Sequence, residues 1–175
     1  MLAVARTSHC LIVMLVAITA RADNWPQFRG PRSDGAVGSA GLPHEWDSET
    51  NIRWKVPIPG EGWSAPIVWG NRLFLTTAVP EQPPRGASPQ SVRPEPYRGG
   101  GGRLRSDLTS AVYSWQLLCL DTETGELLWR RVARKGNPGT PRHSSNTYAT
   151  ETPVTDGERV YAYFGMNGLY CYDLT

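Results

Sequence analysis

The stretch LLCLDTETGELLWRRVA, residues 117–133, decides the fold. It begins with four consecutive apolar residues, which is typical of a strand buried on both faces. Residues 121–126 interrupt the apolar run. Gly125 can adopt the positive φ of a tight turn, and Asp121 can accept hydrogen bonds from nearby backbone N–H groups. A second strand carrying Trp129 follows. The stretch therefore predicts a β-hairpin, which needs further strands or a second layer to bury its apolar faces.

Two other stretches repeat this pattern, so the chain holds two copies of one unit. Residues 168–175, GLYCYDLT, align with residues 116–123, QLLCLDTE, and residues 152–161, TPVTDGERVY, align with residues 65–74, APIVWGNRLF. Each copy predicts a short strand after a proline, a turn, a second strand and a cysteine-containing third strand. The fourth strand, which carries Trp129, is visible only in the first copy. Four short antiparallel strands per repeat are the pattern of a propeller blade. We therefore expect an all-β chain, a β-propeller of four-stranded antiparallel blades with about two blades present.

Residues 119–129, CLDTETGELLW, resemble the repeat of the PQQ-like, or quinoprotein-type, β-propellers, whose pattern is A-x-D-x-x-T-G-x-x-x-W. Four positions of the motif match: Asp121, Thr124, Gly125 and Trp129. Cys119 stands where the family usually has alanine. In that family the motif is structural, and its tryptophan packs on the turn of the adjacent blade. The resemblance implies that Trp129 joins neighbouring blades, and it indicates a propeller without indicating a cofactor.

The N-terminus has the features of an export signal. Arg6 precedes an apolar run over residues 11–17, and residues 20–22, Ala-Arg-Ala, form a small-x-small cleavage site. The run is short for a membrane span. We expect residues 1–22 to be a secretory signal peptide, with an uncleaved anchor as the alternative. The mature chain would then be periplasmic or extracellular, with no transmembrane span. Residues 25–31, WPQFRGP, resemble the opening of many exported bacterial PQQ-like repeat proteins, in which Trp25 and Phe28 would pack on the propeller's flank.

The remaining chain divides into segments by composition and by the repeat. These are an N-terminal extension (23–50), a first blade (63–133) with a Pro-, Gly- and Arg-rich insertion (80–107), a connection (134–151) and an incomplete second blade (152–175). Residues 51–56, NIRWKV, resemble the strand of Trp129 without its three predecessors. We expect this segment to close a ring by pairing with C-terminal strands. Because a ring typically takes four to eight blades, the chain is expected to be the N-terminal part of a longer propeller. A short protein that ends there is the alternative.

Five residues are candidates for contacts with a ligand in the central channel. Trp63 and Ser64 lie at the expected inner end of the first strand, and His143, Asn146 and Tyr148 lie in the polar loop before the second unit. A packing role for Trp63 and a structural role for the polar loop residues stay open.

Motifs for several other functions are missing from the sequence. There is no G-x-S-x-G elbow, no C-x-x-C-H haem motif, no phosphate-binding Walker loop and no zinc-like spacing of Cys and His. The formal charge of +2 does not favour nucleic acid as a partner. Cys119 and Cys171 occupy equivalent positions, and we expect them to be buried apolar residues that form no disulfide. No catalytic, cofactor-binding or metal-binding residue is predicted.

The functional expectation is a non-catalytic, exported scaffold for binding or assembly in the cell envelope. Its partner would be a protein or another envelope component. Two alternatives stay open at this point. One is a periplasmic quinoprotein dehydrogenase of alcohols or sugars, which would use PQQ and calcium. The other is the ectodomain of a sensor, since similar repeats occur in some kinase-linked proteins.

Overall fold

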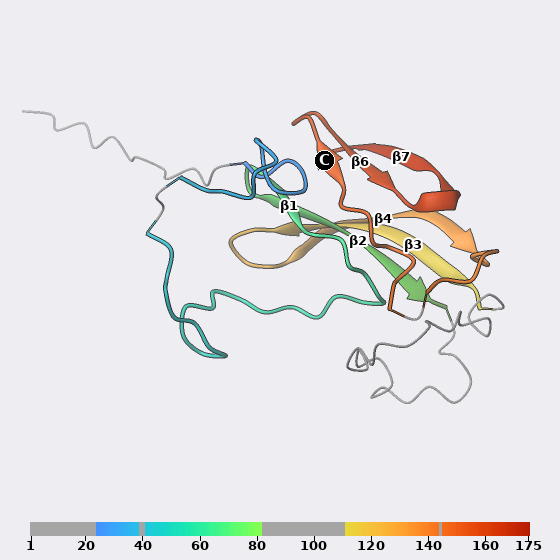
Figure 1. Ribbon diagram of the computed structural model, residues 1–175, viewed down its shortest axis with the longest axis horizontal. Helices are drawn as coiled ribbons and strands as arrows, with labels where there is room; N and C mark the ends of the chain where they lie inside the picture. Colours follow the sequence, from blue (N-terminus) through green and yellow to red (C-terminus); the bar gives the residue numbers. More distant parts are fainter. Residues whose placement is uncertain (1–23, 39–40, 82–110, 144) are drawn as a thin grey trace, which may run out of the picture.

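The computed structural model describes residues 24–38, 41–81, 111–143 and 145–175, and these form two antiparallel sheets (Figure 1). The first sheet contains, in spatial order, β1 (Ile67–Trp69), β2 (Arg72–Pro80), β3 (Tyr113–Asp121) and β4 (Leu127–Gly136). The second contains β5 (Val154–Thr155), β6 (Arg159–Tyr163) and β7 (Leu169–Asp173), with the 3-10 turn η2 (Gly165–Asn167) between β6 and β7. The described residues are thus all-β, as expected, and none of their helices is long and apolar enough to cross a membrane.

The hairpin of β3 and β4 forms as its sequence predicts. Every residue of β3 except the last is buried, in agreement with an apolar run that faces packed layers on both sides. In the turn, Oδ1 of Asp121 accepts hydrogen bonds from the backbone N–H groups of Glu123 (2.8 Å) and Thr124 (2.9 Å). Gly125 has a φ of 74°, a conformation that costs other residues about 1–2 kcal/mol. The turn therefore requires both the carboxylate and the glycine of the motif.

The two sheets are structural repeats of each other. The equivalent ladder pairs are Ile67–Phe74 and Val154–Tyr161 in the first hairpin, Phe74–Cys119 and Tyr161–Cys171 in the second, and Arg72–Asp121 and Arg159–Asp173 at its end. These pairs follow the sequence alignment without a shift of register. A shift by one residue would turn the apolar side chains to the other face, so the agreement confirms that the two copies fold alike.

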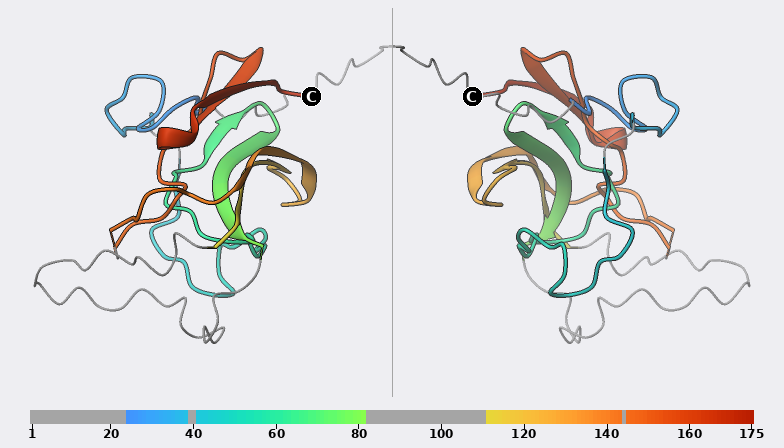
Figure 2. Two further views of the ribbon diagram at one scale, coloured as in Figure 1. Left: turned by 90° about the vertical axis from the view of Figure 1, so that its right-hand side faces the viewer. Right: turned by 90° about the vertical axis from the view of Figure 1, so that its left-hand side faces the viewer.

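The core lies between the two stacked sheets (Figure 2). Phe74, Trp115 and Leu117 from the first sheet form one cluster with Val160 and Ala162 from the second. All five side chains are fully buried. Because neither sheet covers both of its faces alone, the stacking is what removes this apolar surface from water.

Trp129 connects the two sheets at one edge of this core. Its indole Nε1–H donates to the carbonyl oxygen of Leu174 at 3.2 Å, and its ring centroid lies 5.7 Å from that of Phe74. Leu174 directly follows β7. The side chain therefore leaves β4 of the first sheet and ends on the residue that directly follows β7 of the second.

Trp54 makes the same contact with the first sheet. Its Nε1–H donates to the carbonyl of Thr122 at 2.9 Å, and Thr122 is the residue that aligns with Leu174. A Cβ atom on Gly125 would lie 2.6 Å from the Trp54 ring, so only glycine allows the ring to lie this close. Residues 51–56, expected as an outer strand, form no strand among the described residues. Their pairing with C-terminal strands to close a ring stays a prediction.

The N-terminal segment joins the β1 edge of the first sheet to the β5 edge of the second. Trp25 exchanges two backbone hydrogen bonds with Val68 of β1 (2.8 and 2.9 Å), and the carbonyl of Pro26 accepts from the backbone N–H of Thr155 in β5 (2.9 Å). The Trp25 ring packs against Gly30, where a Cβ atom would lie 2.7 Å from it. Phe28, expected to pack beside Trp25, is exposed instead. Backbone atoms of Trp25 and Pro26 hold the segment to the two sheets, and the Phe28 side chain takes no part in these bonds.

Two predicted segment boundaries lie later in the chain than expected, because β2 and β4 are longer than their apolar sequence patterns indicated. β2 continues to Pro80, which pairs with Tyr113, so the insertion begins after residue 80 at the end of the β2–β3 hairpin. β4 continues to Gly136, so the connection starts after residue 136. The predicted signal peptide (1–22) and residues 82–107 of the insertion lie outside the described residues.

Candidate functional site

A buried ion pair lies where the chain entering β1 meets the loop 142–151. The Nη2 atom of Arg142 is 2.6 Å from Oε2 of Glu61, and the two side chains are 8% and 28% exposed. Nη1 of Arg142 donates to the carbonyl of Asn146, and the guanidinium lies over the ring of Tyr148 at 5.4 Å from its centroid. A buried guanidinium needs a carboxylate and further acceptors to offset its lost hydration. Here Glu61 supplies the carboxylate and the Asn146 carbonyl a further acceptor, while the buried Nε of Arg142 has no hydrogen-bond partner among the described residues.

Two glycines place Glu61 beside β2. Glu61 and Ala78 exchange backbone hydrogen bonds of 3.0 and 2.9 Å. A Cβ atom on Gly60 would lie 2.5 Å from the Ala78 carbonyl oxygen, and one on Gly62 would lie 2.6 Å from the Thr76 carbonyl oxygen. Any other residue at these positions would push the strand away. The consequence of this close approach to β2 is a carboxylate held toward Arg142.

Asn146 organises the loop. Its side-chain Oδ1 accepts hydrogen bonds from the backbone N–H of Thr147 (2.8 Å) and the hydroxyl of Thr150 (2.6 Å). Its backbone N–H donates to the carbonyl of His143 at 3.0 Å. Asn146 was predicted as a ligand contact. In this structure its side-chain Oδ1 accepts hydrogen bonds from other residues of the loop. The local role is that of a turn-stabilising side chain.

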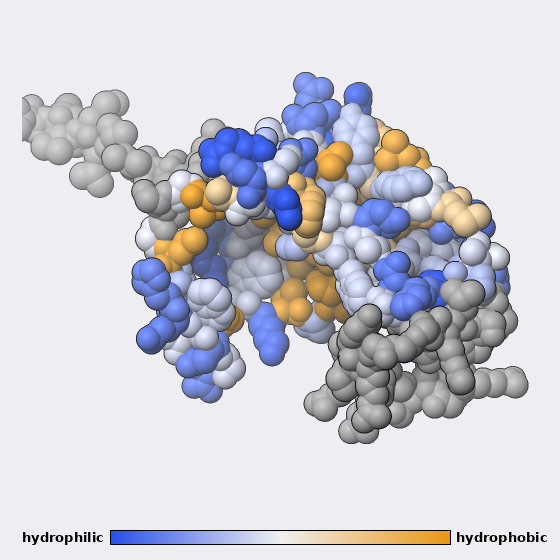
Figure 3. Space-filling view, viewed as in Figure 1, coloured by the Kyte–Doolittle hydropathy of each residue, from blue (hydrophilic) through white to orange (hydrophobic). Residues whose placement is uncertain are grey.

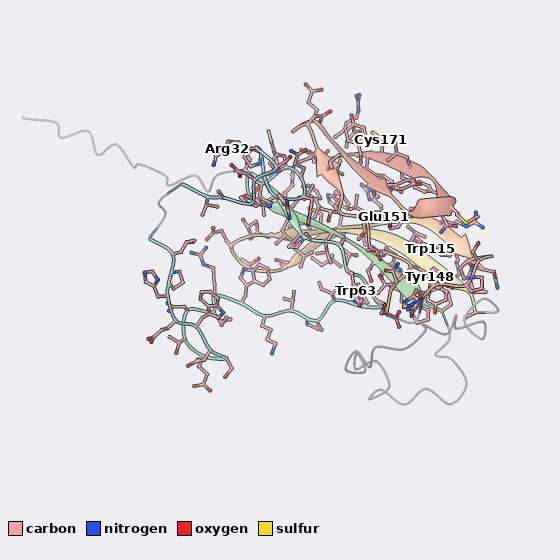
Figure 4. All side chains as sticks on the ribbon, viewed as in Figure 1. Arg32, Trp63, Trp115, Tyr148, Glu151 and Cys171 are labelled. Carbon is pink, nitrogen blue, oxygen red and sulfur yellow. The ribbon has the colours of Figure 1, made fainter. Side chains whose placement is uncertain are left out.

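Tyr148 fastens the loop to the first sheet. Its carbonyl accepts from the indole Nε1–H of Trp115 at 2.9 Å, and its hydroxyl donates to the carbonyl of Thr140 at 3.1 Å. The ring makes edge contacts with Tyr113 and Trp115, with centroid separations of 5.0 and 6.2 Å. Figure 4 shows Tyr148 and Trp115 at one end of the sheets, with Trp63 at the same end. Tyr148, also predicted as a ligand contact, is thus a packing residue at the sheet–loop junction.

Trp63 and Ser64 have different environments although they are neighbours. Ser64 Oγ accepts from the backbone N–H of Thr76 at 3.1 Å and donates to its carbonyl at 3.3 Å, so this hydroxyl extends the β1–β2 ladder. The backbone N–H of Trp63 donates to the carbonyl of Ala149 at 2.9 Å, while its side chain is 56% exposed. The backbone of Trp63 is therefore held against the loop 142–151, while its aromatic side chain stays largely exposed.

His143 is exposed and pairs locally. Its Nδ1 lies 2.6 Å from Oγ of Ser145. No carboxylate forms a hydrogen bond with His143 in the part of the chain that the structure describes. A catalytic His–Ser dyad normally has its imidazole oriented by a third group. The pair has the geometry of a turn contact between residues two positions apart.

The two residues at the centre of the site, Glu61 and Arg142, were not among the predicted candidates. Each had a signal in the sequence. Glu61 lies between two glycines, and Arg142 is the one arginine or lysine between residues 137 and 151. A single cation in a loop that must pack on a sheet needs an acidic partner, but the sequence does not show which acid lies near.

The motif residues around Asp121 have structural roles. Hydrogen bonds from the backbone N–H groups of Thr124 and Glu123 hold the pKa of Asp121 below its ordinary value. The Thr124 hydroxyl adds a contact of 3.2 Å to the same carboxylate oxygen. Cys119 is buried and free, and burial raises its pKa to about 11, whereas its repeat partner Cys171 is free but exposed, contrary to expectation. Its exposure results from the uncovered outer face of the second sheet.

The described residues contain no group of three or more side chains placed to hold a metal ion. No family model, curated protein or solved structure matched the chain.

Proposed function

We propose that the chain belongs to an exported β-propeller of the PQQ-like repeat type that acts as a binding or assembly scaffold in the cell envelope. The observation that carries this proposal is the repeated contact of tryptophan with a backbone carbonyl. Trp54 donates to Thr122 and Trp129 donates to Leu174, at positions that the repeat makes equivalent. One of these contacts joins the two stacked sheets, and a tryptophan contact that recurs at equivalent repeat positions is expected of neighbouring propeller blades.

The proposed binding surface is the exposed face of Trp63 at the junction with the loop 142–151. The backbone of Trp63 is held by Ala149, and the Glu61–Arg142 pair holds the loop itself. A rigidly mounted, exposed tryptophan offers a large contact area at low entropic cost, which is why such residues act as anchors in interfaces. The partner would be a protein or another envelope component.

Trp63→Ala in the complete protein is the test of this surface. The matched control is Trp46→Ala, which removes another exposed tryptophan (68%) from a segment outside the junction. The immobilised wild type and both variants are exposed to solubilised envelope, and retained components are quantified by mass spectrometry. The proposal expects a defined set to be retained by the wild type and by Trp46→Ala and to be lost with Trp63→Ala. Equal retention by all three would remove Trp63 from the function.

A second measurement separates the scaffold from an enzyme. The complete protein is titrated with PQQ in the presence of Ca²⁺, followed by absorbance and calorimetry, and then assayed for dye-linked oxidation of a simple alcohol. The scaffold proposal expects no saturable binding and no oxidation. Saturable binding together with turnover would replace it with quinoprotein dehydrogenase activity, because a bound quinone supplies the redox chemistry that the side chains lack.

A further inference from the structure

A short stretch near the N-terminus lies along the first strands of both sheets. Trp25 exchanges two backbone hydrogen bonds with Val68 in β1, and the carbonyl of Pro26 accepts one from the backbone N–H of Thr155 in β5. β1 and β5 are end strands of their sheets, so residues 24–26 occupy the position of a further strand beside each. This is the arrangement in which an extended peptide adds to the edge of a sheet.

The contacts at this edge define the peptide pattern that it accepts. Trp25 uses both its N–H and its carbonyl, whereas Pro26 uses only its carbonyl, so the N–H that proline lacks is not required there. One residue earlier, Oδ1 of Asn24 accepts a hydrogen bond of 2.8 Å from the backbone N–H of Gly70. The edge therefore suits an extended peptide that has Asn or Asp two positions before a proline.

Side-chain packing contributes little to this attachment. The described residues that form the hydrophobic cluster between the sheets include none from the N-terminal segment, which we define as residues 24–35. The Trp25 ring packs on Gly30 of the same segment, and Phe28 is 59% exposed. Figure 3 shows mainly hydrophilic surface where Figure 1 places this segment. Because main-chain hydrogen bonds to a sheet edge are largely independent of sequence, another extended peptide with the same pattern can replace residues 24–26.

The rest of the N-terminal segment is held in shape by its own hydrogen bonds. Nε2 of Gln27 donates to the carbonyl of Gly30 at 3.1 Å and to Oγ of Ser33 at 2.9 Å. The stretches that connect the segment to the first sheet, residues 31–38 and 41–53, are exposed. The segment can therefore leave the two edges as a unit, without loss of buried surface in the described part of this connection.

We propose that the edges of β1 and β5 form a binding site for an extended peptide of a partner protein, and that residues 24–26 occupy this site as a built-in competitor. A partner segment with the same main-chain pattern displaces them and adds a strand to both sheets. The tethered occupant keeps the site closed to weak ligands, because its effective concentration is on the order of 1 mM. Trp63 takes no part in these contacts, so this site and the surface proposed for Trp63 can fail separately.

Binding of a synthetic peptide added to the full chain tests the site. The peptide has the sequence of residues 24–35 and a fluorescent label, and its binding is followed by fluorescence anisotropy. In the full chain, Trp25→Pro removes the N–H that donates to Val68 and so weakens the tethered occupant. Phe28→Ala is the matched control, because it removes an exposed aromatic side chain of the same segment that makes no bond to either edge.

The Trp25→Pro chain is expected to bind the peptide about tenfold more tightly than the wild type, as for a peptide with a Kd of about 0.1 mM facing a tethered competitor at about 1 mM. Phe28→Ala should behave like the wild type, and a peptide that itself carries Trp25→Pro should lose binding. Far-UV circular dichroism verifies that the variant chains keep their sheets. Equal affinities for the three chains, no binding to the Trp25→Pro chain, or equal binding of the two peptides would overturn the proposal.

Hydrogen exchange of the wild type gives a measurement that needs no variant. The amides of Val68 and Thr155 donate to the segment, and they are expected to exchange about tenfold or more faster than the buried amides of β3, because a local opening requires less free energy than global unfolding. Equal exchange rates would show that the segment separates only when the whole chain unfolds. That result would refute a displaceable occupant even if Trp25→Pro failed to fold.

Discussion

The contact between Trp54 and Gly125 predicts a large destabilisation from a single methyl group. Gly125→Ala places alanine at a φ of 74° and its Cβ 2.6 Å from the indole ring. The backbone strain is about 1–2 kcal/mol. The ring must also move, which loses the hydrogen bond to Thr122, a net loss of about 0.5–1.5 kcal/mol, and part of the burial of a large aromatic side chain. We expect the free energy of unfolding to fall by about 2–4 kcal/mol.

Gly70→Ala is the matched control, because it separates the backbone strain from the tryptophan contact. Gly70 lies in the β1–β2 turn of the same sheet with a φ of 59°, and no atom lies within 4 Å of the Cβ position. Its substitution should cost only the strain of about 1–2 kcal/mol. The difference between the two glycines is then the contribution of the close approach of Trp54.

The assay is urea unfolding of the full chain followed by far-UV circular dichroism, with Trp54→Ala added to complete a double-mutant cycle. In the Trp54→Ala background, the cost of Gly125→Ala should fall to that of Gly70→Ala, because there is no ring left to displace. A coupling free energy near zero, or equal costs for the two glycines in the wild type, would refute the reasoning that the glycine exists to admit the indole.

Two further predictions concern charged groups. Arg142→Ala leaves the carboxylate of Glu61 partly buried without its partner, and we expect a loss of about 2–3 kcal/mol, below the full cost of breaking a buried pair because Glu61 retains some contact with water. Urea unfolding of Arg142→Ala, Glu61→Ala and the double variant measures it, and additive losses would show that the pair is not coupled. Asp121 has a pKa below its ordinary value in the folded chain, so its stabilising effect is present above about pH 4, its unfolded-state value, and is lost as the pH falls through the folded-state value. Asp121→Asn should therefore unfold at a lower urea concentration at pH 7 and lose less stability between pH 5 and pH 2, and a pH profile parallel to the wild type would contradict this.

Much of the fold could be predicted because its signals are local. The apolar run before Asp121, the glycine of the turn and the two aligned stretches predicted the β3–β4 hairpin and the repeat, and the ladder pairs follow that alignment. Residues 51–56 were the exception. Their sequence has the pattern of an outer strand, but a strand requires a neighbour to supply hydrogen bonds, and the described residues provide none to residues 51–56. Their tryptophan contact with Thr122 forms without that neighbour.

The sequence singled out the two segments that meet in the candidate site, and their contact with a ligand stays a prediction. Trp63 and the loop 142–151 do meet at one end of the sheets, since the order of strands determines which segments are close. Within the loop, the side chains of Asn146 and Tyr148 pair with backbone groups of Thr147 and Thr140, which is the structural role that the sequence had left open. Trp63 is the candidate that presents a large aromatic side chain, 56% exposed, to solvent.

The sequence by itself determined the β-class, the turn chemistry and the repeat, because alternation, glycine and side-chain caps act over a few residues. The tertiary structure alone decided which distant groups meet. Arg142 faces Glu61 across 81 positions of the chain, Trp129 reaches Leu174 across 45, and the backbone of Trp25 joins β1. Such pairs depend on how sheets stack, and stacking is driven by non-directional burial of apolar area. Apolar burial specifies that the faces are covered, and side-chain shape and hydrogen bonds then select the partners.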